Sequence, residues 1–266
     1  MNASELAAVL ESLRAQKPLI LSLTNSVVQP ITANMLLAVG ASPVMLNDAE
    51  ESAQLLRSCA NGLLINVGTL SYPQSDQMRM AVDAALAVGV PWVLDPVAVG
   101  LLGFRTEFCR ELLAFSPALI RGNASEIMAL AGEAGGGRGT DTTEDSSAAV
   151  QAARLLAKQC ACAVLVTGPV DYVTDGERLL ALGNGHELMT RVTGVGCAMG
   201  ALAAACVAAA PDAFTGAAAC AAILGIAGER AAVRCPRPGS FAAALLDELD
   251  ALTPADVVEC TRIASK

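Results

Sequence analysis

The chain has 266 residues, is 54% hydrophobic but only 3% aromatic, and has 17 basic and 26 acidic side chains for a net charge of −9. This length falls within the range of a single large α/β domain, and the acidic balance without a Lys/Arg cluster excludes a broad nucleic-acid-binding face. No membrane span is predicted, because no apolar run approaches about 18 residues without a charge, Gly or Pro.

The N-terminal segment and the cysteines indicate a cytoplasmic protein. Residues 1–16 carry Glu5 and Glu11 and lack the basic-then-apolar order of a signal peptide, so they predict an amphipathic helix. The nine cysteines are odd in number and contain no C-x-x-C pair, and His186 is the only histidine, which argues against a structural zinc site. Most of these cysteines are interpreted as small packing residues in a reducing compartment.

Short apolar runs alternate with helical patterns from the start of the chain. Apolar strands separated by helices are typical of a parallel sheet covered on both faces, and right-handed crossovers then give a three-layer α/β sandwich. In chain order, strands are predicted at residues 18–25, 42–46, 61–68, 91–99 and 117–123, with helices between them at residues 31–40, 50–60, 75–89 and 106–115.

The second half of the chain is less regular. Residues 132–147 are rich in Gly, Thr and Ser and predict a surface loop, in which Thr143 is a candidate N-cap for the next helix. A disordered insertion is favoured for residues 135–139 over a mobile flap above a nucleotide. Strands are predicted at residues 163–168 and 171–176, followed by a mostly helical segment, 196–264. Because no internal repeat or long linker divides the chain, residues 1–266 are predicted to form one domain.

Polar residues stand where the predicted strands end. Ligands of open parallel sheets bind outside the carboxyl ends of the strands, although Asn, Asp and Gly also collect there because turns need them. Asp95 and Glu126 are candidate holders of a water-mediated Mg²⁺, and Arg121 is a candidate phosphate ligand. The alternatives are a turn residue before Pro96, stabilisation of a first helical turn, and a surface ion pair. The full set is Asn25, Met45, Asn47, Asn66, Asp95, Arg121, Asn123, Glu126, Thr167 and Gly168.

The stretch TGVGC at residues 193–197 predicts a glycine turn at the start of a helix. Gly194 and Gly196 lack Cβ atoms, so the backbone amides of Gly194, Val195 and Gly196 are able to close around an oxyanion at the positive end of the helix dipole. The alternative interpretation of this stretch is an ordinary glycine turn that binds no anion. The spacing does not match the G-x-G-x-x-G dinucleotide fingerprint.

Several motifs together resemble the hydroxyethylthiazole kinase family of the ribokinase-like superfamily. The resemblance implies a ribokinase-like fold and ATP-dependent phosphorylation, with Mg²⁺, of the primary alcohol of 4-methyl-5-(2-hydroxyethyl)thiazole in thiamine biosynthesis and salvage. It also implies a homotrimer with active sites between subunits, in which residues 32–45 serve a neighbour's site. The motifs are LTNSVVQPITANMLLAVGASPVM at residues 23–45, LDPVAVG at 94–100, RGNASEIMALAG at 121–132, VTG with the following D-x-V-T-D-G at 166–176, and VTGVGC at 192–197.

The resemblance further implies roles for individual residues. Cys197 occupies the place where most ribokinase-like kinases have a catalytic Asp. Its thiol has an ordinary pKa of about 8.5, which a helix N-terminus is able to lower, so Cys197 is a candidate acceptor of the alcohol proton or else only shapes the pocket. Cys197→Asp is expected to retain or raise activity. The resemblance implies substrate contacts for Met45 and Gly194, ATP contacts for Arg121 and Thr167, and proximity to the metal for Asp95 and Glu126. From their positions at strand ends, Asn25 is predicted to join the substrate site, and Asn123 and Gly168 the ATP site.

The sequence departs from the family pattern near the expected thiazole pocket. Ser26, Pro30-Ile31, Met35 and Val195 replace residues more usual in the family, and Met35 is expected to narrow a space that Gly leaves open. Three other functions remain as alternatives: a kinase for another small alcohol such as hydroxymethylpyrimidine, a dehydratase that repairs hydrated NAD(P)H, and a non-catalytic nucleotide-binding sensor. Another kinase or a dehydratase is expected to carry Asp at position 197. The presence of Asp95, Glu126 and Arg121 argues against a sensor that has lost turnover.

Overall fold

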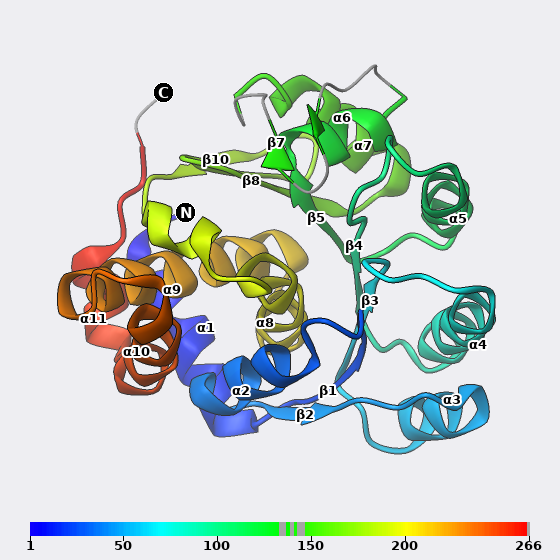
Figure 1. Ribbon diagram of the computed structural model, residues 1–266, viewed down its shortest axis with the longest axis horizontal. Coiled ribbons are helices and arrows are strands. Elements are labelled where there is room, and N and C mark those ends of the chain that lie inside the picture. The colour runs from blue at the N-terminus through cyan, green and yellow to red at the C-terminus, as the bar shows by residue number, and fades with distance from the viewer. Residues whose placement is uncertain (133–136, 139–140, 143–146, 265–266) are drawn as a thin grey trace.

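The predicted strands pair into one sheet in the computed structural model, which describes residues 1–132, 137–138, 141–142 and 147–264. The sheet has eight strands in the order β10-β9-β8-β5-β4-β3-β1-β2 (Figure 1). Neighbours pair in parallel from β2 to β8, whereas β9 pairs antiparallel with both β8 and β10. The strands are β1 (Leu19–Leu23), β2 (Ser42–Val44), β3 (Gly62–Asn66), β4 (Trp92–Asp95), β5 (Leu119–Asn123), β8 (Ala163–Thr167), β9 (Asp171–Thr174) and β10 (Leu179–Leu182).

Helices cover both faces of this sheet, which confirms the predicted three-layer α/β sandwich. One layer, to the right of and above the sheet in Figure 1, contains α3 (Ala49–Ser58), α4 (Tyr72–Val88), α5 (Gly103–Leu113), α6 (Ala124–Leu130) and α7 (Val150–Cys160). The opposite layer contains α1 (Ala3–Gln16), α2 (Gln29–Val39), α8 (Val195–Ala209), α9 (Ala213–Arg234), α10 (Pro238–Ala251) and α11 (Pro254–Cys260), with a 3-10 turn, η1 (Glu187–Arg191), before α8.

The predicted loop at residues 132–147 falls partly outside the described residues. Thr143 lies outside the described residues, as do positions 135, 136 and 139 of the predicted insertion. The short strands β6 (Gly137–Arg138) and β7 (Asp141–Thr142) pair antiparallel within this segment. Strand β10 was not predicted.

The sheet separates two apolar cores because successive side chains of a strand point to opposite faces. Leu64, Val93 and Leu119 face the layer of α8 and α9, whereas their neighbours Leu94 and Ile120 face the layer of α4 and α5. Burial on both faces is typical of parallel strands between two helical layers. The apolar runs in the sequence therefore belong to interior strands.

Small residues let α8 and α9 pack closely against each other and the sheet. A Cβ at Gly216 of α9 would lie 2.7 Å from the Val207 Cα of α8, so a larger residue would separate the helices. Among the described residues, α9 is the one helix long and apolar enough to cross a membrane. However, 83% of its most apolar 18-residue window is buried inside the protein, where it forms part of the core.

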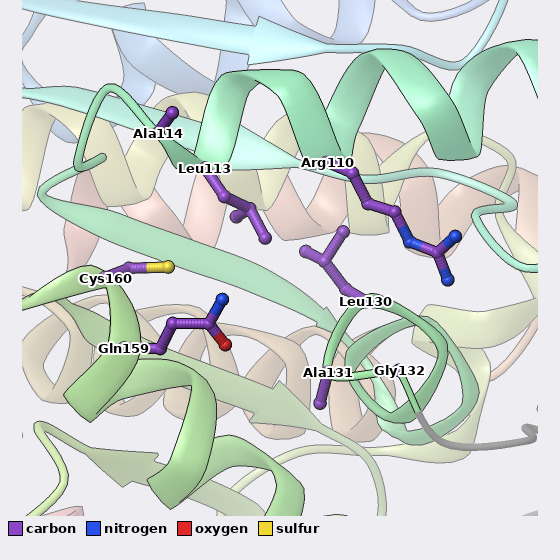
Figure 2. A pocket seen from close by; sticks show the side chains of 8 residues that line it. All are labelled: Arg110, Leu113, Ala114, Leu130, Ala131, Gly132, Gln159 and Cys160. Carbon is purple, nitrogen blue, oxygen red and sulfur yellow. The ribbon is translucent and has the colours of Figure 1, made fainter.

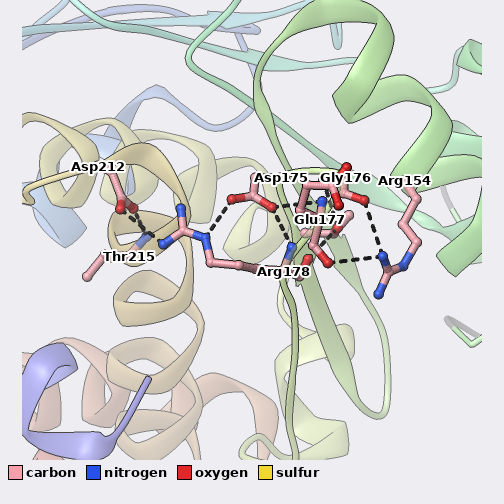
Figure 3. Close-up of polar contacts among 8 residues, drawn as sticks. Arg154, Asp175, Gly176, Glu177, Arg178, Asp212 and Thr215 are labelled. Carbon is pink, nitrogen blue, oxygen red and sulfur yellow. Dashed lines mark hydrogen bonds and ion pairs between the residues drawn. The ribbon is translucent and has the colours of Figure 1, made fainter.

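The turn between β9 and β10 is fastened to the start of α9 (Figure 3). Arg178 Nε donates a hydrogen bond to Asp175 Oδ2 at 2.6 Å, and its Nη1 donates to Asp212 Oδ2 at 3.1 Å. The Arg178 guanidinium also lies 4.2 Å from the centroid of the Phe214 ring. Asp212 is the N-cap of α9 and accepts the Thr215 N–H at 2.7 Å. These contacts hold the antiparallel end of the sheet against the helical layer.

Candidate active site

A row of polar side chains runs across the carboxyl edge of the sheet from β1 to β8. Asn25 Nδ2 donates to Asn66 Oδ1 at 2.9 Å, and Asn66 Nδ2 donates to Asp95 Oδ2 at 2.6 Å. Arg121 Nη1 lies 3.5 Å from Asp95 Oδ1, and Arg121 Nη2 donates to Thr167 Oγ1 at 3.1 Å. Five of the strand-end residues identified from the sequence therefore form one connected network, which we call the polar row: Asn25, Asn66, Asp95, Arg121 and Thr167.

The alternation of the strands explains why these side chains meet. Strands β3, β4, β5 and β8 each have an apolar residue in the core beneath α8 and α9, and the polar residue follows at the next position on the same face. The order of the polar row also follows the order of the strands in the sheet. The pairs of core and polar residue are Leu64 and Asn66, Val93 and Asp95, Leu119 and Arg121, and Leu165 and Thr167.

The N-terminus of α8 faces the centre of the polar row. A Cβ at Gly196 would lie 3.4 Å from Arg121 Nη2, and one at Gly200 would lie 3.2 Å from Asp95 Oδ2. Gly194 has a φ of +93°, and a Cβ there would lie 2.8 Å from Ile31 Cγ2. Glycine is therefore required at position 194 by both backbone conformation and space. The first N–H groups of a helix have no partner within the helix, so this end of α8 offers donors and a positive dipole beside Arg121.

Cys197 is half-buried in the first turn of α8, beside the polar row. Burial and the nearby Asp95 carboxylate raise the pKa of its thiol to about 11, although Asn66, Arg121 and Asn25 act in the opposite direction. The pKa of Cys197 is therefore raised and not lowered, which favours the alternative in which the thiol only shapes the pocket. At neutral pH the Cys197 thiol keeps its proton.

The carboxyl groups of Asp95 and Glu126 both lie at the carboxyl edge of the sheet, but they have different hydrogen-bond partners. Asp95 is fully buried, and this burial, together with the charge of Glu126, raises its pKa to about 7 against the opposing effects of Arg121 and Asn66. Glu126 accepts the backbone N–H groups of Ala98 and Asn123, each at 2.9 Å, and burial raises its pKa as well. Glu126 therefore joins the loop after β4 to the start of α6.

Arg121 is buried, so the alternative of a surface ion pair is wrong. Asn123 is the N-cap of α6, with its Oδ1 accepting the Glu126 N–H at 3.0 Å. Gly168 donates its N–H to Asp171 Oδ1 at 2.9 Å. Met45 is half-buried just after β2, the strand that ends the sheet beyond β1. Along the sheet, Met45 is therefore far from Arg121.

Three residues that depart from the family pattern lie in different surroundings: two are buried in the core and one is exposed. Met35 is fully buried within the core between α2 and α8, and Val195 is also buried. The Met35 side chain fills space in this core, and its effect on the thiazole pocket stays a prediction. Ser26 is exposed, and its N–H donates to Thr69 Oγ1 at 3.1 Å.

Asn66 and Asp171 are site residues that the sequence did not assign to a role. Asn66 ends a buried strand in the same way as Asp95, and this shared position was the signal available for it. Asp171 begins β9 next to the glycine turn after β8. Within the described residues, no group of three or more His, Cys, Asp and Glu side chains is placed to hold a metal ion.

A separate pocket of about 480 Å³ lies at the opposite, amino edge of the sheet. Figure 2 shows the side chains that line it. It lies where α5, α6 and α7 end, which is the amino edge of β5 and β8, because α5 and α7 lead into these strands. It is therefore distinct from the polar row. Its lining residues are Arg110, Leu113, Ala114, Leu130, Ala131, Gly132, Gln159 and Cys160.

Known proteins resemble this chain over nearly its whole length. The sequence model of the hydroxyethylthiazole kinase family matches residues 10–255. A hydroxyethylthiazole kinase from Akkermansia muciniphila is 54% identical over 258 residues, which is 97% of this chain and 95% of the relative. The structure of a hydroxyethylthiazole kinase protein from Pyrococcus horikoshii OT3 superposes with a TM-score of 0.88 at 36% identity, covering 98% of this chain and 99% of that one. A ribokinase-like superfamily protein from Enterococcus faecalis V583 has a TM-score of 0.64 at 11% identity, covering 92% and 89% of the two chains, and this likeness concerns the fold alone.

Proposed function

The chain belongs to the hydroxyethylthiazole kinase family, and from this premise we propose that it transfers the γ-phosphoryl group of ATP to the primary alcohol of 4-methyl-5-(2-hydroxyethyl)thiazole, a step of thiamine biosynthesis and salvage. The observation that carries this proposal is the N-terminus of α8 facing the buried Arg121–Asp95 pair. A helix N-terminus beside a fixed guanidinium is suited to the charge of a transferring phosphoryl group.

Arg121 and Thr167 hold the phosphates of ATP in this proposal, with Asn123 and Gly168 at the same edge. The Arg121 guanidinium is buried and oriented by Asp95 and Thr167. Its Nε has no hydrogen-bond partner among the described residues. A planar, preoriented guanidinium with donors to spare suits recognition of phosphate oxygens.

The thiazole alcohol lies at the other end of the polar row, against Gly194 and Asn25. We assign the anion hole, toward which the γ-phosphoryl group moves, to the amides of Gly194, Val195 and Gly196. The Val195 N–H donates a long hydrogen bond of 3.5 Å to the Val192 carbonyl oxygen and would exchange this bond for the phosphate. Because phosphoryl transfer passes through a loose transition state, positioning and charge stabilisation supply most of the acceleration, and a strong base is not needed. The raised pKa of Cys197 supports a role in which its thiol orients the hydroxyl instead of removing the proton.

Mg²⁺ fits this edge as an ion bound mainly by ATP and water. Asp95 Oδ1 is a buried oxygen without a hydrogen-bond partner in the described chain, and Glu126 lies close enough for its charge to raise the Asp95 pKa. Mg²⁺ characteristically keeps several waters and uses only one or two carboxylates, so a larger protein cage is not required. Asp95 and Glu126 would hold its waters, and the ion would neutralise charge on the phosphates.

The proposal includes a homotrimer whose sites lie between subunits. The position of Met45 just after the outermost strand β2, away from Arg121 along the sheet, supports its use in a neighbour's site. We treat residues 1–266 as one domain, since the eight strands belong to one sheet. A cytoplasmic location is supported by the cysteines, all nine of which are free thiols.

The test is ADP production from Mg-ATP with a panel of small alcohols that includes the thiazole and pyrimidine alcohols. Turnover that depends on the thiazole alcohol is expected, and Cys197→Asp is expected to retain or raise it. Turnover on a different alcohol would contradict the substrate assignment. ATP binding without any turnover would instead support a sensor. Omitting Mg²⁺ is expected to abolish turnover.

A further inference from the structure

Asp171 is an acid next to the proposed ATP site that the proposed function does not use. The antiparallel pairing of β8 and β9 aligns Val166 with Tyr172, which places Asp171 directly opposite Thr167. Opposed residues of an antiparallel pair point to the same face, so Asp171 and Thr167 share the face that carries Arg121. The Asp171 carboxyl group is half-buried there.

The Asp171 side chain closes the turn that connects the two strands. Its Oδ1 accepts the Gly168 N–H at 2.9 Å. Gly168 is exposed and is followed by Pro169, which has no N–H of its own. Glycine has the widest choice of backbone conformations. The backbone directly after Thr167 is therefore the part of this turn that loses the most conformational entropy when it is ordered. The bond from Gly168 to Asp171 restricts that freedom.

Asp171 also lies within the electrostatic reach of Arg121. Burial raises the pKa of Asp171 to about 7, while the Gly168 N–H and the Arg121 guanidinium act to lower it. The carboxyl group thus adjoins both elements assigned to ATP, the guanidinium on β5 and the chain at the end of β8. A half-buried acid beside a cation at the edge of a site is a candidate for a functional role.

We propose that Asp171 is a positioning residue for ATP, which holds the Thr167–Gly168 segment in its binding conformation through the hydrogen bond to the Gly168 N–H. This inference rests on the proposed function, since it takes Arg121 and Thr167 as ATP ligands. Asp171 acts through the backbone and does not touch the reacting atoms. An oxygen acceptor at this position is therefore required, whereas its negative charge is not.

The experiment compares Asp171→Ala with Asp171→Asn in the full-length enzyme. The Kd of ATP is measured by titration calorimetry, and kcat and both KM values are measured by ADP release. Asp171→Ala is expected to raise the Kd and KM for ATP about fivefold to tenfold, the size of one modest hydrogen bond, with kcat and the KM of the alcohol within about twofold. Asp171→Asn keeps an oxygen acceptor and is expected to bind ATP within about twofold of wild type.

Asp175→Ala is the matched control. Asp175 closes the next turn in the same way, with its Oδ1 accepting the N–H groups of Glu177 at 3.0 Å and Arg178 at 2.7 Å, at the end of the hairpin away from Arg121. It is expected to lower the melting temperature without changing the Kd of ATP. A rise in Kd in the control as large as that in Asp171→Ala would mean that loss of hairpin order alone explains the effect, and it would overturn the inference.

The inference and the proposed function fail separately. Unchanged ATP binding in Asp171→Ala, a loss confined to kcat, or an Asn variant as weak as the Ala variant would each overturn the role of Asp171, even if the wild type phosphorylates the thiazole alcohol. A wild type that binds ATP but phosphorylates no alcohol would overturn the proposed function, while the Kd values would still decide the role of Asp171. A wild type that does not bind ATP would overturn both.

Discussion

Asn66 and Asp95 are register partners on the parallel strands β3 and β4, and the Asn66 amide donates a hydrogen bond of 2.6 Å to the fully buried Asp95 carboxyl group. The Oδ1 of the same Asn66 accepts from Asn25 Nδ2 at 2.9 Å and from the Gly68 N–H at 3.0 Å. The Asn66 side chain thus accepts from donors at the ends of β1 and β3 and donates to the acid at the end of β4. Removing it would leave buried polar groups without partners.

Asn66→Ala is therefore expected to reduce both stability and turnover. Leaving a buried donor or acceptor unsatisfied costs about 1–3 kcal/mol, so the free energy of unfolding is expected to fall by about this amount. Loss of the Asp95 orientation is expected to lower kcat/KM about tenfold or more. Urea unfolding and ADP release measure the two effects. A variant with wild-type stability and turnover would contradict the importance of this bond.

Gly200→Ala tests how closely α8 must approach Asp95. The new Cβ would lie 3.0 Å from Leu64 Cδ1 and 3.2 Å from Asp95 Oδ2, so α8 or the carboxyl group has to shift. Overpacking of this kind costs about 1–3 kcal/mol. Gly103→Ala in α5 is the matched control, because its Cβ would meet nothing within 4 Å, and its free energy of unfolding is expected to stay within about 1 kcal/mol of wild type. Equal effects of the two substitutions on urea unfolding would refute the packing argument.

The reactivity of Cys197 toward iodoacetamide is expected to be low at pH 8 and to rise with pH. Because the thiolate is the reacting form and the pKa of Cys197 is about 11, the thiolate fraction rises about tenfold per pH unit up to that value. Site-resolved mass spectrometry follows the rate, with the exposed Cys59 as an internal reference. Rapid labelling of Cys197 that no longer changes above pH 8 would indicate a lowered pKa and would restore the thiolate as a candidate base.

Asp171→Asn is expected to change how stability depends on pH. Burial holds the proton of Asp171 in the folded state up to about pH 7, whereas its ordinary pKa is 3.8. Between these values the folded state binds more protons than the unfolded chain, so this group makes the free energy of unfolding fall as pH rises. The Asn variant lacks that fall. Its stability relative to wild type is expected to increase from about pH 4 to about pH 7 and then level off, as measured by urea unfolding at successive pH values. A constant difference would mean that the pKa of Asp171 is not raised.

Local patterns in the sequence were sufficient for most of the fold. The apolar runs ending at Asn66 and Asp95 predicted interior strands, and Gly40 and Gly89 marked the ends of α2 and α4, where both adopt positive φ. Strand β10 was missed because the segment around Leu179 and Leu180 follows a charged turn and is only partly buried. The parallel order of the strands also brought the ends of distant segments together, which made the polar row predictable as a set.

What the sequence did not predict depends on long-range packing. Met35 and Val195 lie near site residues along the chain, but the rotation of α2 and α8 about their axes turns both into the core. The raised pKa of Cys197 reflects burial and the charge of Asp95, a residue far away in sequence. The role of Asn66 likewise required its neighbours on both sides to be known. Each of these properties belongs to the assembled layers and not to any segment.

The polar row also links ligand binding to completion of the fold. Its members come from β1 or the turn after it, β3, β4, β5 and β8, so every one of these strands must be in place before Asn25 and Thr167 are joined. A partly folded chain that lacks β8 would have Arg121 without its Thr167 contact. Any ligand that engages the whole row therefore binds the native state alone and stabilises it by mass action. Saturating ATP and alcohol would therefore lower the population of unfolded chain, and the enzyme in a cell would be degraded more slowly when these ligands are abundant.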